Sequence, residues 1–251
     1  MEMQSDGSQS WFENWFDTPY YHALYKSRDE QEAARFLELL LQKLDLTKGA
    51  KVLDLACGKG RHAQFLSQQG FRVLGVDLSE NSISEAKKLE GDHLHFRVGD
   101  MRLPQGNQEF DAVFNLFTSF GYFESSSENL KTLQSVWHSL RPGGLLVVDF
   151  MNSEKAIQTL QPEYHLIRSG IEFFITKSIE NQIISKKIRF REKGKDYAFE
   201  ERVQLLKLED FQAYFSKTGF KLVQIFGDYS LNPFDSQESE RLILIGQKLV
   251  I

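Results

Sequence analysis

The feature that most constrains this chain is residues 51–61, Lys-Val-Leu-Asp-Leu-Ala-Cys-Gly-Lys-Gly-Arg. The first half is an apolar run of the kind that forms a central strand in a parallel sheet. The second half is a glycine turn that leads into a helical pattern, and glycine lets backbone N–H groups come close to a ligand because it has no Cβ. Strand, glycine turn and helix in this order begin a nucleotide-binding βαβ unit, although a lone glycine turn also occurs in other α/β proteins.

The alternation of strand and helix patterns continues after this unit. Strands are expected at 51–55, 72–77, 94–98, 110–115 and 145–150, with helices between them, and two closing strands at 220–226 and 241–246. A helix is also expected at 29–45, ahead of the first strand. Strands that alternate with helices in this way predict an α/β fold with a doubly wound parallel sheet.

Between residues 162 and 206 the pattern changes to segments rich in Ile, Phe, Val and Tyr. Ser169-Gly170 and Lys193-Gly194 are hairpin-turn signals, so about three strands (165–177, 181–191 and 197–206) are expected here. The predicted domain organisation has three parts. They are an N-terminal tail and cap helix (1–46), a main domain (47–161 with 207–251) and an inserted antiparallel β-sheet (162–206).

Composition excludes several classes of protein. The chain has 251 residues, of which 41% are hydrophobic, and a net charge of −5, which disfavours a broad nucleic-acid surface. The only cysteine is Cys57, so no internal disulfide can form. The polar first residues and the lack of a long apolar run predict a cytoplasmic protein without a membrane span. The histidines lack metal-binding spacing, so no metal is expected.

Acidic residues stand at the ends of the first three predicted strands. Asp54 lies four residues before Gly58, Asp77 ends the second strand, and Asp100 follows the third. The carboxyl ends of neighbouring parallel strands meet at one crevice, which favours a ligand-binding role for these acids. The other interpretation makes Asp77 a charge at a helix start and Asp100 a turn residue.

Together with Leu140-Arg-Pro-Gly-Gly-Leu145 before the fifth strand, these motifs resemble the series found in class I S-adenosylmethionine-dependent methyltransferases. The resemblance covers residues from about 51 to 152, and the tail from about 208 to 251 fits the family's last helix and closing strands. It implies a Rossmann-like, doubly wound, seven-stranded and mostly parallel sheet with helices on both faces. A dehydrogenase would also use Asp77, but the other motifs argue against one.

The resemblance also implies a cofactor site for S-adenosylmethionine without a metal. The methionine arm would lie over the glycine turn, Asp77 would accept both ribose hydroxyls, and Asp100 would accept the adenine amino group. In glycine and sugar N-methyltransferases a tyrosine and an arginine before the first helix touch the methionine end, and Tyr25 and Arg28 match them, unless this segment only packs the helix. The expected cofactor-binding residues are Tyr25, Arg28, Asp54, Ala56, Gly58, Gly60, Asp77, Leu78, Asp100, Met101, Leu116 and Phe117.

The expected function is transfer of a methyl group to N or O of a small-molecule acceptor by in-line displacement. Tyr21, Tyr122 and Asn152 are the candidates for accepting a proton or orienting the acceptor. The inserted sheet has the place of a lid over the acceptor in the small-molecule relatives, and a homodimer through this sheet stays open. Two alternatives also remain: a binding or assembly protein of the same fold, and an RNA or protein methyltransferase.

Overall fold

The computed structural model describes residues 11–25 and 30–250, which form two compact units. The larger unit comprises Asp29–Thr159 and Leu206–Ile251. The smaller unit comprises the residues up to Arg28 together with Leu160–Leu205. The boundary in the N-terminal part therefore lies near residue 28, and the first long helix belongs to the larger unit.

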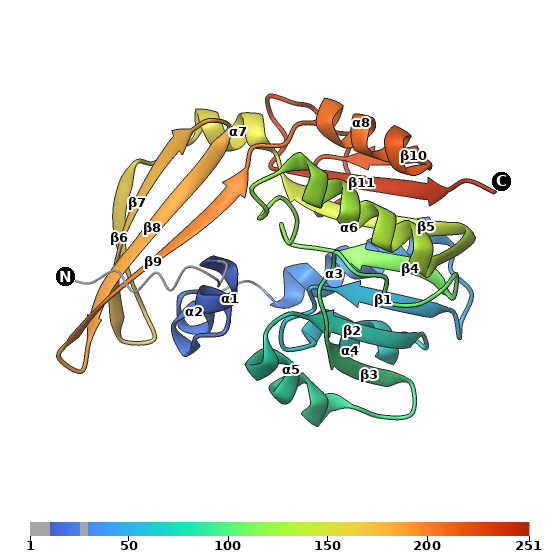
Figure 1. Cartoon of the computed structure of the whole chain (residues 1–251), viewed down its shortest axis with the longest axis horizontal. Helices are drawn as coiled ribbons and strands as arrows, with labels where there is room; N and C mark the ends of the chain where they lie inside the picture. Colours follow the sequence, from blue (N-terminus) through green and yellow to red (C-terminus); the bar gives the residue numbers. More distant parts are fainter. Residues whose placement is uncertain (1–10, 26–29, 251) are drawn as a thin grey trace. The chain divides into compact units, whose positions relative to one another are not determined.

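The larger unit contains a seven-stranded sheet with the order β10-β11-β5-β4-β1-β2-β3 (Figure 1). Neighbours from β5 to β3 pair in parallel, whereas β11 is antiparallel to both β5 and β10. The strand order reverses between β1 and β4, which is where doubly wound sheets bind ligands. The predicted fold class is confirmed. The strands are β1 (Lys51–Leu55), β2 (Arg72–Asp77), β3 (Leu94–Val98), β4 (Phe110–Asn115), β5 (Leu140–Met151), β10 (Phe220–Phe226) and β11 (Arg241–Lys248).

Helices cover both faces of this sheet because its central strands are apolar on each side; four of the five residues of β1 are buried. Residues of α3, α4 and α5 join one cluster with Val52, Phe114 and Ile243. On the other face Phe211 of α8 packs against Phe150. The helices of this unit are α3 (Glu30–Leu44), α4 (Arg61–Gln68), α5 (Glu80–Ala86), η1 (Lys87–Leu89), α6 (Ser126–Ser139), α7 (Ser153–Gln158) and α8 (Leu208–Thr218).

The smaller unit contains four antiparallel strands in the order β6-β7-β8-β9 and two short helices, α1 (Trp11–Phe16) and α2 (Pro19–Leu24). The strands are β6 (Glu163–Arg168), β7 (Ile171–Glu180), β8 (Ile183–Glu192) and β9 (Lys195–Gln204). The expectation of about three strands is wrong. The turn at Ser169-Gly170 divides the predicted strand 165–177 into β6 and β7.

The two short helices supply one side of the core of the smaller unit. Trp15 and Leu24 are buried together with Phe173, Ile188 and Phe190 of the sheet. A segment of six residues is too short to hold a helix by itself, so this packing stabilises α1 and α2. Among the described residues no helix is long and apolar enough to cross a membrane.

Candidate functional site

The two glycines of the turn between β1 and α4 are required for different reasons. A Cβ at Gly60 would lie 2.4 Å from the Phe96 ring, so packing excludes any larger residue there. A Cβ at Gly58 would meet nothing within 4 Å. Gly58 therefore borders open space at the carboxyl end of β1, where a ligand can approach its backbone. Ala56 adopts a left-handed backbone with φ of 65°.

Asp77 at the end of β2 fixes this turn. One of its carboxylate oxygens accepts a hydrogen bond from the Gly58 N–H (2.8 Å), and the other accepts from the Ser79 N–H (2.9 Å). The residue thus lies beside the start of α5, as the alternative interpretation expects, and also at the glycine turn. Each carboxylate oxygen offers two acceptor positions. Leu78 is 37% exposed next to it.

Asp54 is buried, with 2% of its surface exposed. Its Oδ2 atom has no hydrogen-bond donor in the part of the chain that the structure describes. Burial and the charge of Asp77 raise the pKa of Asp54 to about 7, while the Ala63 N–H lowers it in part. A buried acceptor without a donor fits a ligand that brings N–H groups or positive charge.

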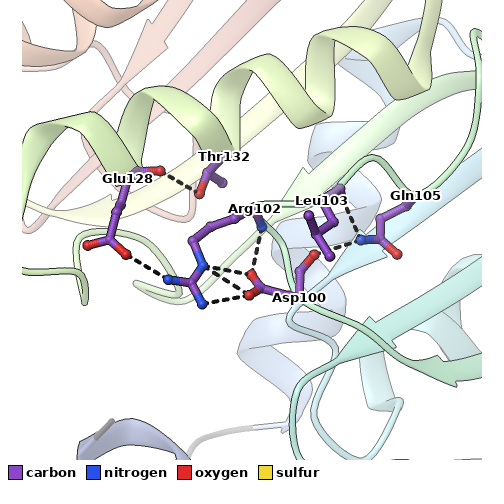
Figure 2. A network of polar contacts seen from close by, with 6 residues as sticks. All are labelled: Asp100, Arg102, Leu103, Gln105, Glu128 and Thr132. Atoms are coloured by element: carbon purple, nitrogen blue, oxygen red, sulfur yellow. Dashed lines mark hydrogen bonds and ion pairs between the residues drawn. The ribbon is translucent and has the colours of Figure 1, made fainter. Parts of the chain in front are cut away.

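Asp100 belongs to a polar network beyond β3 (Figure 2). Arg102 forms an ion pair with Asp100 (2.6 Å) and a second one with Glu128 of α6 (2.6 Å). Burial raises the pKa of the Asp100 carboxyl, but the hydrogen bonds and charge of Arg102 outweigh it and hold that pKa below its usual range. The carboxylate is therefore ionised and fixed in place. Sequence reasoning did not identify Arg102, and Met101 lies half-buried between these two residues.

The loop after β4 has an unusual backbone. Phe117 and Thr118 both have positive φ values, 57° and 61°, which cost free energy in residues with a side chain. The Phe117 N–H donates to the Asp149 carboxylate (2.8 Å), and the Thr118 N–H donates to the Asp149 carbonyl (2.9 Å). Leu116 is buried beneath them. Asp149 therefore holds this loop from the end of β5.

Arg241 at the start of β11 completes this arrangement. Its Nε donates to Asp149 (2.8 Å) and its Nη2 donates to the Thr118 hydroxyl (3.0 Å). Asp149 is fully buried, which raises its pKa, and the charge of Arg241 opposes that rise. Tyr229 also donates to Asp149 (3.3 Å).

His62 of α4 stacks on the Phe117 ring with 4.5 Å between ring centroids. No pattern in the sequence links His62, Tyr229 or Arg241 to this loop.

The residues predicted to act on the acceptor do not all lie in one unit. The Tyr122 hydroxyl donates to the Thr118 carbonyl in the larger unit. Asn152 is the N-cap of α7, where its side chain accepts from Glu154 N–H and donates to two carbonyls. Tyr21 lies on α2 in the smaller unit and packs against Trp15. The catalytic roles of Tyr21, Tyr122 and Asn152 stay predictions.

Of the two cofactor residues predicted in the N-terminal segment, Tyr25 and Arg28, the structure describes only Tyr25. The Tyr25 hydroxyl donates to Glu201 at 2.7 Å within the smaller unit. Arg28 lies outside the described residues. Cys57 is buried, which raises the pKa of its thiol, so it is not a reactive thiolate. Among the described residues no group of His, Cys, Asp or Glu side chains could hold a metal ion.

Comparison with known proteins identifies the class. Residues 52–144 match the family model described as a methyltransferase domain. The inferred methyltransferase YqeM of Bacillus subtilis (strain 168) is 29% identical over 81% of this chain and 86% of its own length. The dTDP-3-amino-3,4,6-trideoxy-alpha-D-glucopyranose N,N-dimethyltransferase of Streptomyces venezuelae is 31% identical over 51% of this chain and 54% of its own.

A solved structure has the same fold. The S-adenosylmethionine-dependent methyltransferase from Clostridium acetobutylicum ATCC 824 superposes with a TM-score of 0.79 at 22% identity, and the match covers 92% of this chain and 96% of that one. These findings confirm the resemblance read from the motifs. The chain carries a methyltransferase domain at residues 52–144 and is an enzyme similar to S-adenosylmethionine-dependent methyltransferases.

Proposed function

We propose that this enzyme binds S-adenosylmethionine over the glycine turn of the larger unit and methylates N or O of a small-molecule acceptor. One observation supports the cofactor site above the others. The buried Asp54 oxygen without a donor, the open side of Gly58 and the carboxylate of Asp77 all belong to the carboxyl ends of β1 and β2. A ligand with an ammonium group and two ribose hydroxyls matches these three features.

Each remaining cofactor residue has a role consistent with its place. Asp100, held by Arg102, would accept the adenine amino group, and the exposed side chain of Leu78 would lie against the adenine ring. Phe117 would form a wall of the site, since its backbone is fixed by Asp149. Ala56, Gly60, Met101 and Leu116 shape the same edge, and the assignments of Tyr25 and Arg28 rest on the family resemblance alone.

The bound cofactor supplies a methyl group on a sulfonium, which is already activated for displacement. The protein therefore has to align the acceptor and keep water away, and a general base is needed only for an acceptor that arrives protonated. Tyr122 and Tyr21 carry hydroxyls able to orient an acceptor. Asn152 is the weaker candidate, because its amide already caps α7 and binds two carbonyls.

A small-molecule acceptor is favoured by relatives and by charge. The Streptomyces venezuelae relative acts, by its name, on an amino sugar. The net charge of −5 is unfavourable for binding a polyanion such as RNA. An RNA or protein acceptor is the competing assignment. Incubation with labelled cofactor and separate fractions of metabolites, RNA and protein decides between them, and label in the RNA or protein fraction alone would contradict the proposal.

The cofactor site is tested by calorimetry with S-adenosylhomocysteine. The Asp77→Ala variant removes the carboxylate that faces the ribose and the Gly58 N–H, so affinity should fall by at least about tenfold. Asp92→Ala is the matched control because Asp92 is an exposed aspartate of the same unit, and it should bind as the unmodified protein does. Equal affinities of the two variants would refute the assignment of Asp77.

A further inference from the structure

One face of the β6–β9 sheet carries three charged side chains that are largely shielded from solvent: Lys177, Lys186 and Glu201. We call it the inner face, because α1 and α2 pack against its apolar part. Lys177 of β7 and Lys186 of β8 stand directly opposite each other in the register of the two strands. Lys186 is in turn opposite Glu201 of β9. Like charges directly opposite on neighbouring strands destabilise a sheet.

The single carboxylate of this group is already fully engaged. Glu201 accepts hydrogen bonds from the Trp15 indole (2.7 Å) and from the Tyr25 hydroxyl (2.7 and 2.8 Å). It also forms an ion pair with Lys186 (3.4 Å), in which both side chains are nearly buried, with 14% and 13% exposed. Lys186 donates to the Tyr25 hydroxyl as well. Glu201 therefore neutralises Lys186 and not Lys177.

Lys177 remains without a close acceptor. In residues 11–25 and 30–250 its ammonium group has no hydrogen bond and no ion pair, and it lies 5.2 Å from the centre of the Tyr164 ring. Burial lowers the pKa of Lys177, although Glu201 raises it in part. Glu201 forms its ion pair with Lys186, so the charge of Lys177 has no ion-pair partner among the described residues. Buried charges are normally paired, so this one calls for an anion.

We propose that this lysine cluster (Lys177, Lys186, Glu201, Tyr25 and Tyr164) binds an oxyanion, a carboxylate or a phosphate, carried by the methyl acceptor. Lys177 supplies the charge, and the Tyr164 ring lies beside its ammonium group. The assignment to the acceptor rests on the proposed function, whereas oxyanion binding itself does not.

The test uses the full chain loaded with S-adenosylhomocysteine and two pairs of probes. Thymidine diphosphate is titrated against thymidine, and acetate against acetamide, so that each anion has a neutral counterpart. At least one anion should bind, and Lys177→Met should weaken it by at least about tenfold, as loss of a charged hydrogen bond does. Lys177→Arg should retain binding. Binding of the diphosphate alone points to a phosphate, and binding of acetate to a carboxylate.

Lys187→Met is the matched control, because Lys187 is the adjacent residue on the opposite, exposed face of β8. It should bind the anion as the unmodified protein does. The inference is overturned if neither anion binds, if Lys177→Met binds as well as the unmodified protein, or if Lys187→Met weakens binding equally. Thermal unfolding shows that Lys177→Met is folded, and it should unfold no lower than the unmodified protein because a like-charge pair has been removed.

The link to the acceptor has its own readout. Once labelling has identified the acceptor, Lys177→Met should raise the KM for that acceptor by the same factor by which it weakens anion binding. The affinity for S-adenosylhomocysteine should stay unchanged. An unchanged KM would separate the cluster from the acceptor. If S-adenosylhomocysteine itself does not bind the unmodified protein, the proposed function fails, while the titrations without it still test the oxyanion site.

Discussion

Replacing Gly58 or Gly49 by alanine tests the cofactor site, because each substitution adds a single methyl group. Both have a positive φ, 54° and 82°, and at both a Cβ would meet nothing within 4 Å. Replacement by alanine should therefore cost each about 1–2 kcal/mol of unfolding free energy, because the left-handed backbone disfavours a side chain. Only at Gly58 should the added methyl also weaken the binding of S-adenosylhomocysteine, by at least about tenfold. Chemical denaturation and calorimetry measure the two effects, and equal loss of affinity at both positions would contradict this prediction.

Asp54 predicts a pH dependence of cofactor binding. Its pKa of about 7 in the free protein means that the carboxyl is largely protonated below that pH. A positively charged ligand favours the carboxylate, so binding should release a proton, and affinity should rise as pH increases through about 7. Calorimetry in buffers of different ionisation enthalpy measures the proton. The Asp54→Asn variant should lose this pH dependence, and a dependence that persists in it would assign the effect to another group.

The same pKa shift has a consequence for stability. The pKa of Asp54 in the folded protein is raised above its ordinary value of 3.8, so between about pH 4 and pH 7 the folded state retains a proton that the unfolded chain has lost. The resulting stabilisation is complete below about 3.8 and is lost as pH rises through about 7. The ligand-free protein should therefore lose unfolding free energy from about pH 4 to pH 7. Asp54→Asn should flatten this part of the profile in denaturant titrations, and an unchanged slope would contradict it.

At the scale of elements, the buried pair of Asp149 and Arg241 joins β5 and β11 to the loop after β4. Arg241→Met leaves a buried carboxylate without its partner and should cost about 3–5 kcal/mol of unfolding free energy. The double variant Asp149→Asn with Arg241→Met should be more stable than Arg241→Met alone, because no buried charge remains. Urea unfolding of both variants gives these differences.

The exposed ion pair of Lys155 and Glu238 serves as the control for that experiment. Its atoms are 3.4 Å apart and Glu238 is 82% exposed. Lys155→Met should change the free energy of unfolding by no more than about 1 kcal/mol. A loss in Lys155→Met as large as that in Arg241→Met would show that burial does not set the cost of removing the arginine.

The sequence predicts site residues that lie at the ends of its strands, but not those that depend on contacts between distant elements. Asp54, Asp77 and Asp100 could be predicted because each follows an apolar run, and parallel strands bring their carboxyl ends together. Arg241 could not, since it lies 92 residues from Asp149 and meets it only through the antiparallel register of β11. The helices α1 and α2 were also missed, because their aromatic side chains pack against a sheet formed much later in the chain.

At the scale of the whole molecule, the two units have separate hydrophobic cores. A chain reduced to residues 29–159 joined to 206–251 should therefore fold and still bind S-adenosylhomocysteine, while losing the oxyanion site. A variant that lacks only residues 160–205 should instead aggregate, because Trp15 and Leu24 lose the sheet that buries them. Size-exclusion chromatography compares the two. An aggregated first variant would show that the cores depend on each other.

The parts of the smaller unit are synthesised far apart in time, which bears on the order in which they fold. The helices α1 and α2 are synthesised before the sheet they pack against, and the hydrogen bond from Trp15 to Glu201 spans 186 residues. Residues 29–159 of the larger unit are therefore synthesised before the aromatic segment has a sheet to cover. Closing so long a loop costs entropy. Folding of this enzyme should accordingly end where its sequence begins, with the N-terminal helices as the last part to reach their place.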